Sequence, residues 1–156
     1  MIRIEWDISA ALRGLNALRD ALRDLRPAWP SVLVYLRKAT QQTFATQGGR
    51  IGEQWTELST GYAKEKAKVW PGQPILRASD AMFNSLVGQT GDSVAEMQRD
   101  SFAYGTRDRK AKYHQRGTSR MPRRAMLAVT EEDRREIRGL MKLHLENHLR
   151  INGFGS

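Results

Sequence analysis

The segment from residue 106 to residue 124 sets the main constraint on the fold, because it concentrates charge that a protein interior does not accept. It contains one acidic residue, Asp108, and eight basic residues, so it holds a net +7 of the chain's formal +9. The basic residues are Arg107, Arg109, Lys110, Lys112, Arg116, Arg120, Arg123 and Arg124. Gly117 and Pro122 favour turns over a regular helix. The sequence therefore predicts a long basic loop that faces water or a partner.

The rest of the composition is that of an ordinary single domain. The chain has 156 residues, of which 40% are hydrophobic and 28% charged. A domain of this length buries about 70% of its extended-chain surface and needs no disulfide or metal for stability. The chain has no cysteine, which excludes a disulfide framework and thiol catalysis. Residues 1–7 are charged where a signal peptide is apolar, so we expect synthesis in the cytoplasm and no membrane partner.

The N-terminal third changes its hydrophobic period from two residues to that of a helix. Ile2, Ile4 and Trp6 alternate with charged residues and predict a short half-buried strand. An amphipathic helix follows and ends at Pro27. Its apolar face is a row of leucines, Leu12, Leu15, Leu18, Leu22 and Leu25.

A second helix begins at Pro30 and Ser31 and ends at Gly48. We expect the two helices to form an antiparallel hairpin within residues 1–47. An exposed row of five leucines would favour aggregation. The leucine row is therefore predicted to be buried against the second helix or against a neighbouring subunit.

The remainder of the chain mixes helices and strands. A helix is predicted over residues 59–68, another over 75–86, and two strands over 87–98 and 101–105 that form a hairpin. The last helix, within residues 130–153, opens on a capping-box pattern. We therefore expect one α+β domain with a helical hairpin at its N-terminus, a central β-hairpin and motif-bearing region (48–129), a long basic loop and a C-terminal helix.

The sequence contains no convincing catalytic or metal-binding pattern. His144 and His148 lie four positions apart, but the zinc-protease pattern needs a glutamate directly after the first histidine, and Leu145 is there. His114 has only Asp108 nearby as an orienting carboxylate. No glycine-rich phosphate loop or serine elbow is present. We therefore expect no enzyme, no cofactor and no metal.

Binding is the remaining kind of function, and the residues leave its partner open. The basic segment attracts nucleic acid backbones, although Tyr113 is its only aromatic residue, or it docks onto an acidic protein surface. Trp55 and Trp70 lie in an irregular stretch rich in glycine and proline. They either belong to a partner surface or fill a small satellite core.

Six motifs in order carry a family resemblance. They are Trp-Thr-Glu-Leu-Ser (55–59), Ile-Leu-Arg-Ala-Ser (75–79), Tyr-Gly-Thr (104–106), Tyr-His-Gln-Arg-Gly (113–117), Pro-Arg-Arg-Ala-Met-Leu (122–127) and the capped helix from Thr130. Over about residues 44–137 the chain resembles the virion morphogenesis or tail-completion family of tailed bacteriophages and prophages, which includes Mu-like tail-terminator and neck proteins. Asp80 departs from the pattern, since a glycine is common there.

The resemblance implies a non-enzymatic virion protein at the neck or at the head-proximal end of the tail. Such a protein completes the tail or joins it to the head as a ring, most often six-fold. Its partners would be copies of itself, adjacent neck, connector or tail-tube proteins, and DNA passing through the channel. The basic segment, Trp55 and Trp70 would then form partner surfaces. The alternative is a small basic nucleic-acid-binding protein outside the virion, whose binding weakens steeply with salt.

Overall fold

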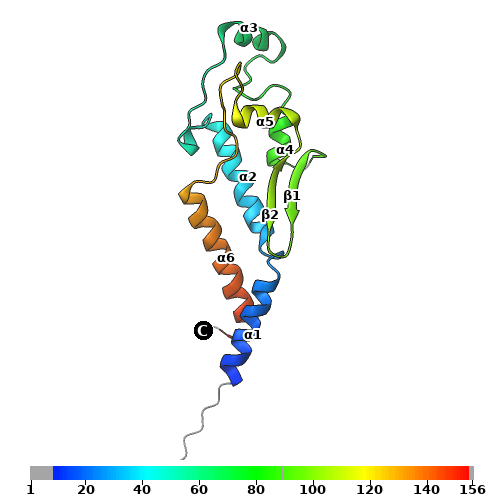
Figure 1. Ribbon diagram of the computed structural model, residues 1–156, viewed down its shortest axis with the longest axis vertical. Helices are drawn as coiled ribbons and strands as arrows, with labels where there is room; N and C mark the ends of the chain where they lie inside the picture. The colour runs from blue at the N-terminus through cyan, green and yellow to red at the C-terminus, as the bar shows by residue number, and fades with distance from the viewer. Residues whose placement is uncertain (1–8, 89, 155–156) are drawn as a thin grey trace, which may run out of the picture.

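Helix α2, Trp29–Ala45, runs through the middle of an elongated molecule and contacts elements on both sides of it (Figure 1). The computed structural model describes residues 9–88 and 90–154. Helix α6, Glu131–Ile151, lies along one side of α2, and helix α4, Ala81–Val87, and the β-hairpin lie along the other. The molecule is α+β, as the sequence predicts. The strand expected at Ile2, Ile4 and Trp6 lies outside the described residues.

The main core lies beside the C-terminal end of α2. Phe44 packs edge-on against Trp55, with 5.3 Å between ring centroids, and Leu86 and Met126 complete the same cluster. The Trp55 indole Nε1 donates a hydrogen bond to the Ala125 carbonyl at 2.8 Å. This core therefore joins segments from four distant parts of the chain.

The first two helices do not form the expected hairpin. Helix α1, Ser9–Arg23, packs on α6 instead of α2, and Figure 1 shows it at the opposite end of the molecule from helix α3, Thr60–Val69. The connection to α2 is held by the β-hairpin turn. The Leu25 amide donates to the Arg99 carbonyl at 2.8 Å, and the Trp29 indole donates to the Gln98 carbonyl at 2.7 Å. Because these bonds fix the connection, the chain continues away from α1 instead of reversing.

Helix α1 packs within the subunit through its small residues and the half-buried Leu18, and not through the whole leucine row. Gly14, Ala17 and Ala21 share one face, Ala21 is buried, and the Phe154 ring covers Gly14 so closely that an added Cβ would lie 3.3 Å from it. Large fractions of three leucines remain exposed, namely 50% of Leu12, 63% of Leu15 and 52% of Leu22. The prediction that α2 buries the leucine row is therefore wrong.

The central hairpin is confirmed, with shorter elements than the sequence predicts. Strand β1, Ser93–Met97, pairs antiparallel with β2, Phe102–Thr106. Helix α4 covers only Ala81–Val87 and not residues 75–86. Leu76 and Asp80 have φ values of 62° and 59°, which interrupt a right-handed helix before it begins. Asp80 thus adopts the left-handed conformation that glycine, common there in the resembling family, adopts more easily.

The other helix starts follow their capping residues. Helix α3, Thr60–Val69, begins after Ser59, whose hydroxyl accepts from the Tyr62 amide. Helix α6 begins with the capping box of Thr130 and Asp133, in which each side chain accepts a hydrogen bond from the other residue's amide. A short 3-10 helix, η1 (Gly49–Ile51), links α2 to the following loop.

Candidate partner-binding site

The basic segment is not one long loop. Residues Arg109–Arg116 form helix α5, which begins because the Asp108 side chain accepts a hydrogen bond from the Lys110 amide at 2.8 Å. Ala111, the small residue of this helix, is buried against the core. Asp108 and Ala111 therefore favour a helix in a stretch that its charge alone predicts to be a loop.

Arg124 is buried and supports the fold, contrary to the prediction that the whole segment faces a partner. Only 5% of it is exposed. Its Nε donates to the Thr56 carbonyl at 2.9 Å and its Nη2 to the Glu57 carbonyl at 3.1 Å. The next residues, Ala125 and Met126, enter the core, so the chain carries Arg124 inward with them.

The other basic side chains of the segment lie on the surface. Arg107 pairs with Glu96 at 3.1 Å and Arg123 with Glu53 at 3.2 Å, and both pairs are exposed. The remaining side chains have no carboxylate partner within the described ranges 9–88 and 90–154, and they are Arg109, Lys110, Lys112, Arg116 and Arg120. These five cations remain available to an external partner.

The two tryptophans have different environments. Trp55 is 3% exposed and belongs to the core, so the core interpretation is the correct one for this residue. Trp70 is 38% exposed and lines a cavity at the end of the molecule that holds α3. Only Trp70 can therefore contact a partner without unfolding.

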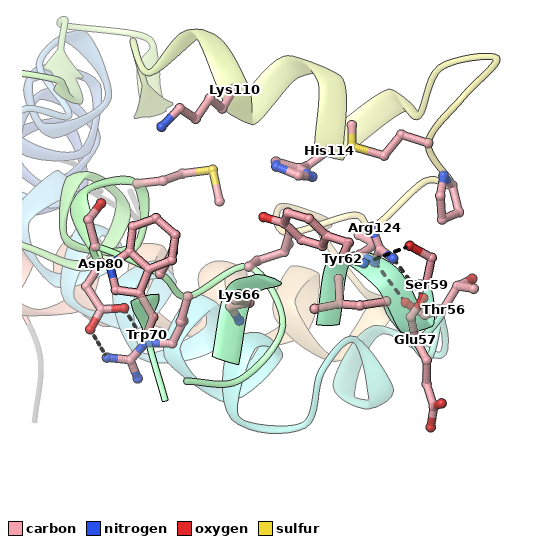
Figure 2. Close-up of a pocket in the computed structure, with 18 of the residues that line it drawn as sticks. Thr56, Glu57, Ser59, Tyr62, Lys66, Trp70, Asp80, Lys110, His114 and Arg124 are labelled. Carbon is pink, nitrogen blue, oxygen red and sulfur yellow. Dashed lines mark hydrogen bonds and ion pairs between the residues drawn. The ribbon is translucent and has the colours of Figure 1, made fainter. Parts of the chain in front are cut away.

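This cavity has a volume of about 730 Å³ and lies between α3, α5 and the segments 56–59, 76–82 and 120–124. Figure 2 shows Lys110 and His114 of α5 on one side of it, facing Tyr62 and Lys66 of α3. Its apolar wall is made by Leu58, Tyr62, Trp70, Leu76, Met82, Met121 and Pro122. Sequence analysis did not predict the cavity, because its walls come from segments that no local pattern brings together.

Three nitrogen-bearing side chains of the cavity are withdrawn from water. Lys66 is 6% exposed, and its Nζ donates to the Gln73 carbonyl at 2.8 Å and to the Pro74 carbonyl. His114 has a buried Nδ1 without a hydrogen-bond partner in the described part of the chain. Burial lowers the pKa of Lys66, of Arg124 and of His114, because each loses hydration of its charged form. The cavity thus combines an apolar wall with poorly hydrated cationic groups.

The other histidines lie far from this cavity along the chain. His144 and His148 are partly buried on α6. Within residues 9–88 and 90–154 there is no group of three or more histidine or acidic side chains that could hold a metal ion. Over the same residues, no helix is both long and apolar enough to cross a membrane.

Comparison with known proteins decides the family. The model of the phage virion morphogenesis family matches residues 6–146 of this sequence. The chain belongs to that family. As a virion morphogenesis protein it has a role in building the phage particle. The match begins well before residue 44, so α1 and α2 are part of the family's common region and not an addition to it.

No curated protein and no solved structure matches this virion morphogenesis protein.

Proposed function

We propose that this protein is a non-enzymatic subunit that assembles into a ring at the neck or head-proximal end of the phage tail, completing the tail or joining it to the head. Membership of the virion morphogenesis family supports an assembly role. Copies of the same chain and adjacent neck, connector or tail-tube proteins are the proposed partners. The family resemblance favours six subunits.

The exposed leucine row of α1 is the observation that carries this proposal. Leu12, Leu15 and Leu22, the exposed leucines of the row, are separated by three and seven positions and therefore share one face of α1. The subunit leaves this face uncovered, because the buried or half-buried residues of α1 are Gly14, Ala17, Leu18 and Ala21. A ring needs two different surfaces on each subunit. We assign the leucine row to one of them.

Sedimentation velocity of purified protein tests the self-association. Replacing Leu15 and Leu22 together with aspartate should convert the assembled species to monomer, because two charges would be buried in the interface. The control is Val34→Asp, a charge introduced at a residue that is 67% exposed on α2 and outside the row. A wild-type protein that stays monomeric at all concentrations, or a double variant that assembles normally, would contradict the proposed ring.

A phage carrying a deletion of the coding gene tests the place of action. The proposed function requires heads and tails that fail to join, or tails of the wrong length, when particles are viewed by electron microscopy. Complementation with the Leu15→Asp, Leu22→Asp gene should fail, whereas the Val34→Asp gene should restore infectious particles. Normal particles from the deletion would exclude the proposal.

The five unpaired cations of the basic segment also support a second candidate, binding to nucleic acid outside a virion. In this case affinity for a DNA duplex should fall by about one power of salt concentration for each phosphate contact. The two functions separate clearly, since the assembly role predicts the sedimentation result above and the second predicts a monomer that binds DNA.

A further inference from the structure

We propose that the cavity beneath α5 binds a segment of a partner protein that carries a carboxylate next to an aromatic or aliphatic side chain. The inference deepens the proposed function, on which it rests, by naming the chemistry of a partner in assembly. It depends on the two buried cations, Lys66 and Arg124, and on the exposed aromatic side chains that line the cavity with them.

Both buried cations have hydrogen-bond donors that the subunit leaves unused. The ammonium of Lys66 has three N–H groups, and two of them bond to the Gln73 and Pro74 carbonyls. The guanidinium of Arg124 has five, and its two side-chain bonds go to the Thr56 and Glu57 carbonyls. These acceptors are neutral. Donors therefore remain for an acidic ligand.

Neither cation is ion-paired in the described part of the chain, although Asp80 acts on Lys66 from beyond ion-pair distance. No carboxylate lies in ion-pair contact with Lys66 or Arg124 within residues 9–88 and 90–154. Two of the three acids that line the cavity have other roles, since Asp80 pairs with Arg77 at 2.8 Å and Asp108 caps α5. A buried charge without a partner is costly. A carboxylate supplied by the ligand would remove this cost.

The lining of the cavity as a whole carries more positive than negative charge. Five lysine or arginine residues line the cavity, against three acidic residues. His114 adds its unpartnered Nδ1 on the side formed by α5, and Figure 2 places it opposite Tyr62. Negative charge is therefore favoured at this site, and positive charge is not.

The apolar wall indicates a protein segment and not DNA. Tyr62 is 55% exposed and Trp70 38% exposed, although both line the cavity. Exposed aromatic side chains beside a pocket are typical of the anchoring positions of protein interfaces, and Met82 and Met121 adapt their shape to an inserted side chain. The backbone of a DNA duplex remains on the protein surface and does not reach Lys66 and Arg124, which lie inside the cavity.

Selection from a library of random dodecapeptides, with the full-length protein as bait, provides a ligand for the test. The peptides enriched on wild-type protein should carry aspartate or glutamate within two positions of an aromatic or aliphatic residue. Trp70→Ala should lower the affinity of the best peptide about tenfold or more, as expected for an anchoring aromatic residue. The matched control is Val69→Ala, because Val69 is 63% exposed on the neighbouring position and does not line the cavity.

Nuclear magnetic resonance locates the bound peptide. Its addition should shift the indole N–H signal of Trp70 and the signals of residues around Lys66, and replacement of the peptide's acids by their amides should abolish binding. Lys66→Met should weaken peptide binding by a similar factor. If this variant fails to fold, the affinity of the Trp70→Ala variant and the binding of the amide peptide still test the proposal. Three results would overturn the proposal: a library without enriched acids, equal peptide affinities of the Trp70→Ala and Val69→Ala variants, or displacement of the peptide by a DNA duplex.

The peptide-binding test gives a result that does not depend on assembly of the ring. Trp70→Ala leaves the leucine row of α1 intact, so its sedimentation should equal that of wild type. Loss of peptide binding with normal assembly supports the cavity proposal, and normal peptide binding in the monomeric Leu15→Asp, Leu22→Asp variant shows that the two surfaces act separately.

Discussion

Arg50 and Asp133, which are 83 positions apart in the sequence, form a largely buried ion pair that fastens the start of α6 to η1, just after α2. Only 1% of the Asp133 side chain and 14% of the Arg50 side chain are exposed. The Tyr35 hydroxyl donates to the same carboxylate at 2.7 Å, and the Thr130 amide donates to it at 2.8 Å. One side chain thus caps α6 and connects it to α2 and η1.

Asp133→Asn should lower the free energy of unfolding by about 3 to 5 kcal/mol, because it leaves the Arg50 charge buried and unpaired. Glu132→Gln is the matched control, since Glu132 is the exposed neighbour in the same turn, and its effect should stay within about 0.5 kcal/mol. Urea unfolding followed by circular dichroism measures both. Equal stabilities of the two variants would show that the pair contributes nothing.

The same carboxylate should make stability depend on acid pH. Burial alone would raise the pKa of Asp133, but hydrogen bonds from Arg50, Tyr35 and Thr130 outweigh it and hold the pKa well below its usual range. A lowered pKa contributes stability above the unfolded value, about 3.9, and this contribution is lost as pH falls below it. The melting temperature should therefore drop below about pH 4 in wild type, and Asp133→Asn should show a smaller drop.

Stability should also fall at alkaline pH because of Tyr35. Burial and the bond to Asp133 raise the pKa of Tyr35 to about 12. A raised pKa contributes stability that is complete below the unfolded value, about 10, and is lost as pH rises from there toward 12. Tyr35→Phe should remove this part of the alkaline loss, which thermal melts between these pH values would detect. Identical alkaline profiles of variant and wild type would contradict it.

Arg124 and Arg120 should respond differently to the same replacement. Arg124→Met removes two hydrogen bonds to the backbone of residues 56 and 57 and leaves their carbonyls unsatisfied, at a cost of about 2 to 4 kcal/mol. Arg120→Met, at an exposed position, should change stability by less than about 0.5 kcal/mol.

Replacing Arg109, Lys110, Arg120 and Arg123 together with serine should likewise leave the melting temperature nearly unchanged while weakening incorporation into particles. An early melt of this quadruple variant would assign these residues to the fold.

Two glycines near the core provide another matched pair. Gly48 has a φ of 89°, and an added Cβ would lie 2.0 Å from the Glu53 carbonyl oxygen and 2.6 Å from the Trp55 ring. Gly52 has a φ of 74° and nothing within 4 Å. Gly52→Ala should therefore cost only the backbone strain, about 1 kcal/mol, whereas Gly48→Ala should cost several times as much, as measured by urea unfolding. Equal costs would mean that the loop moves freely away from Trp55.

Local chemistry made much of the fold predictable from the sequence. Capping residues such as Ser59 and Thr130 identified helix starts, and the turn at residues 98–101 identified the hairpin. Packing partners were less predictable, because the leucines of α1 indicate an apolar face but not what covers it. For the same reason the burial of Arg124 was missed, since charge indicates exposure until the core residues after it fix its position.

The candidate site was only partly predictable. Trp70, Lys110, Arg120 and Arg124, expected at a partner surface, do line the cavity. Lys66 gave no signal, because a lysine in a short charged helix is normally solvated, and its burial depends on the carbonyls of Gln73 and Pro74 that the chain brings back to it.

The leucine row and the cavity lie at opposite ends of the elongated molecule (Figure 1). Subunits that associate through α1 would therefore present identical cavities together on one rim. When linked sites bind one partner together, each site raises the effective concentration of ligand at the next. The overall affinity of two or more weak contacts then exceeds the affinity of each contact alone by about a hundredfold or more. Each cavity then needs only a weak ligand. A single subunit would release its partner quickly, whereas the complete assembly would hold it, so that attachment waits for completion of the ring.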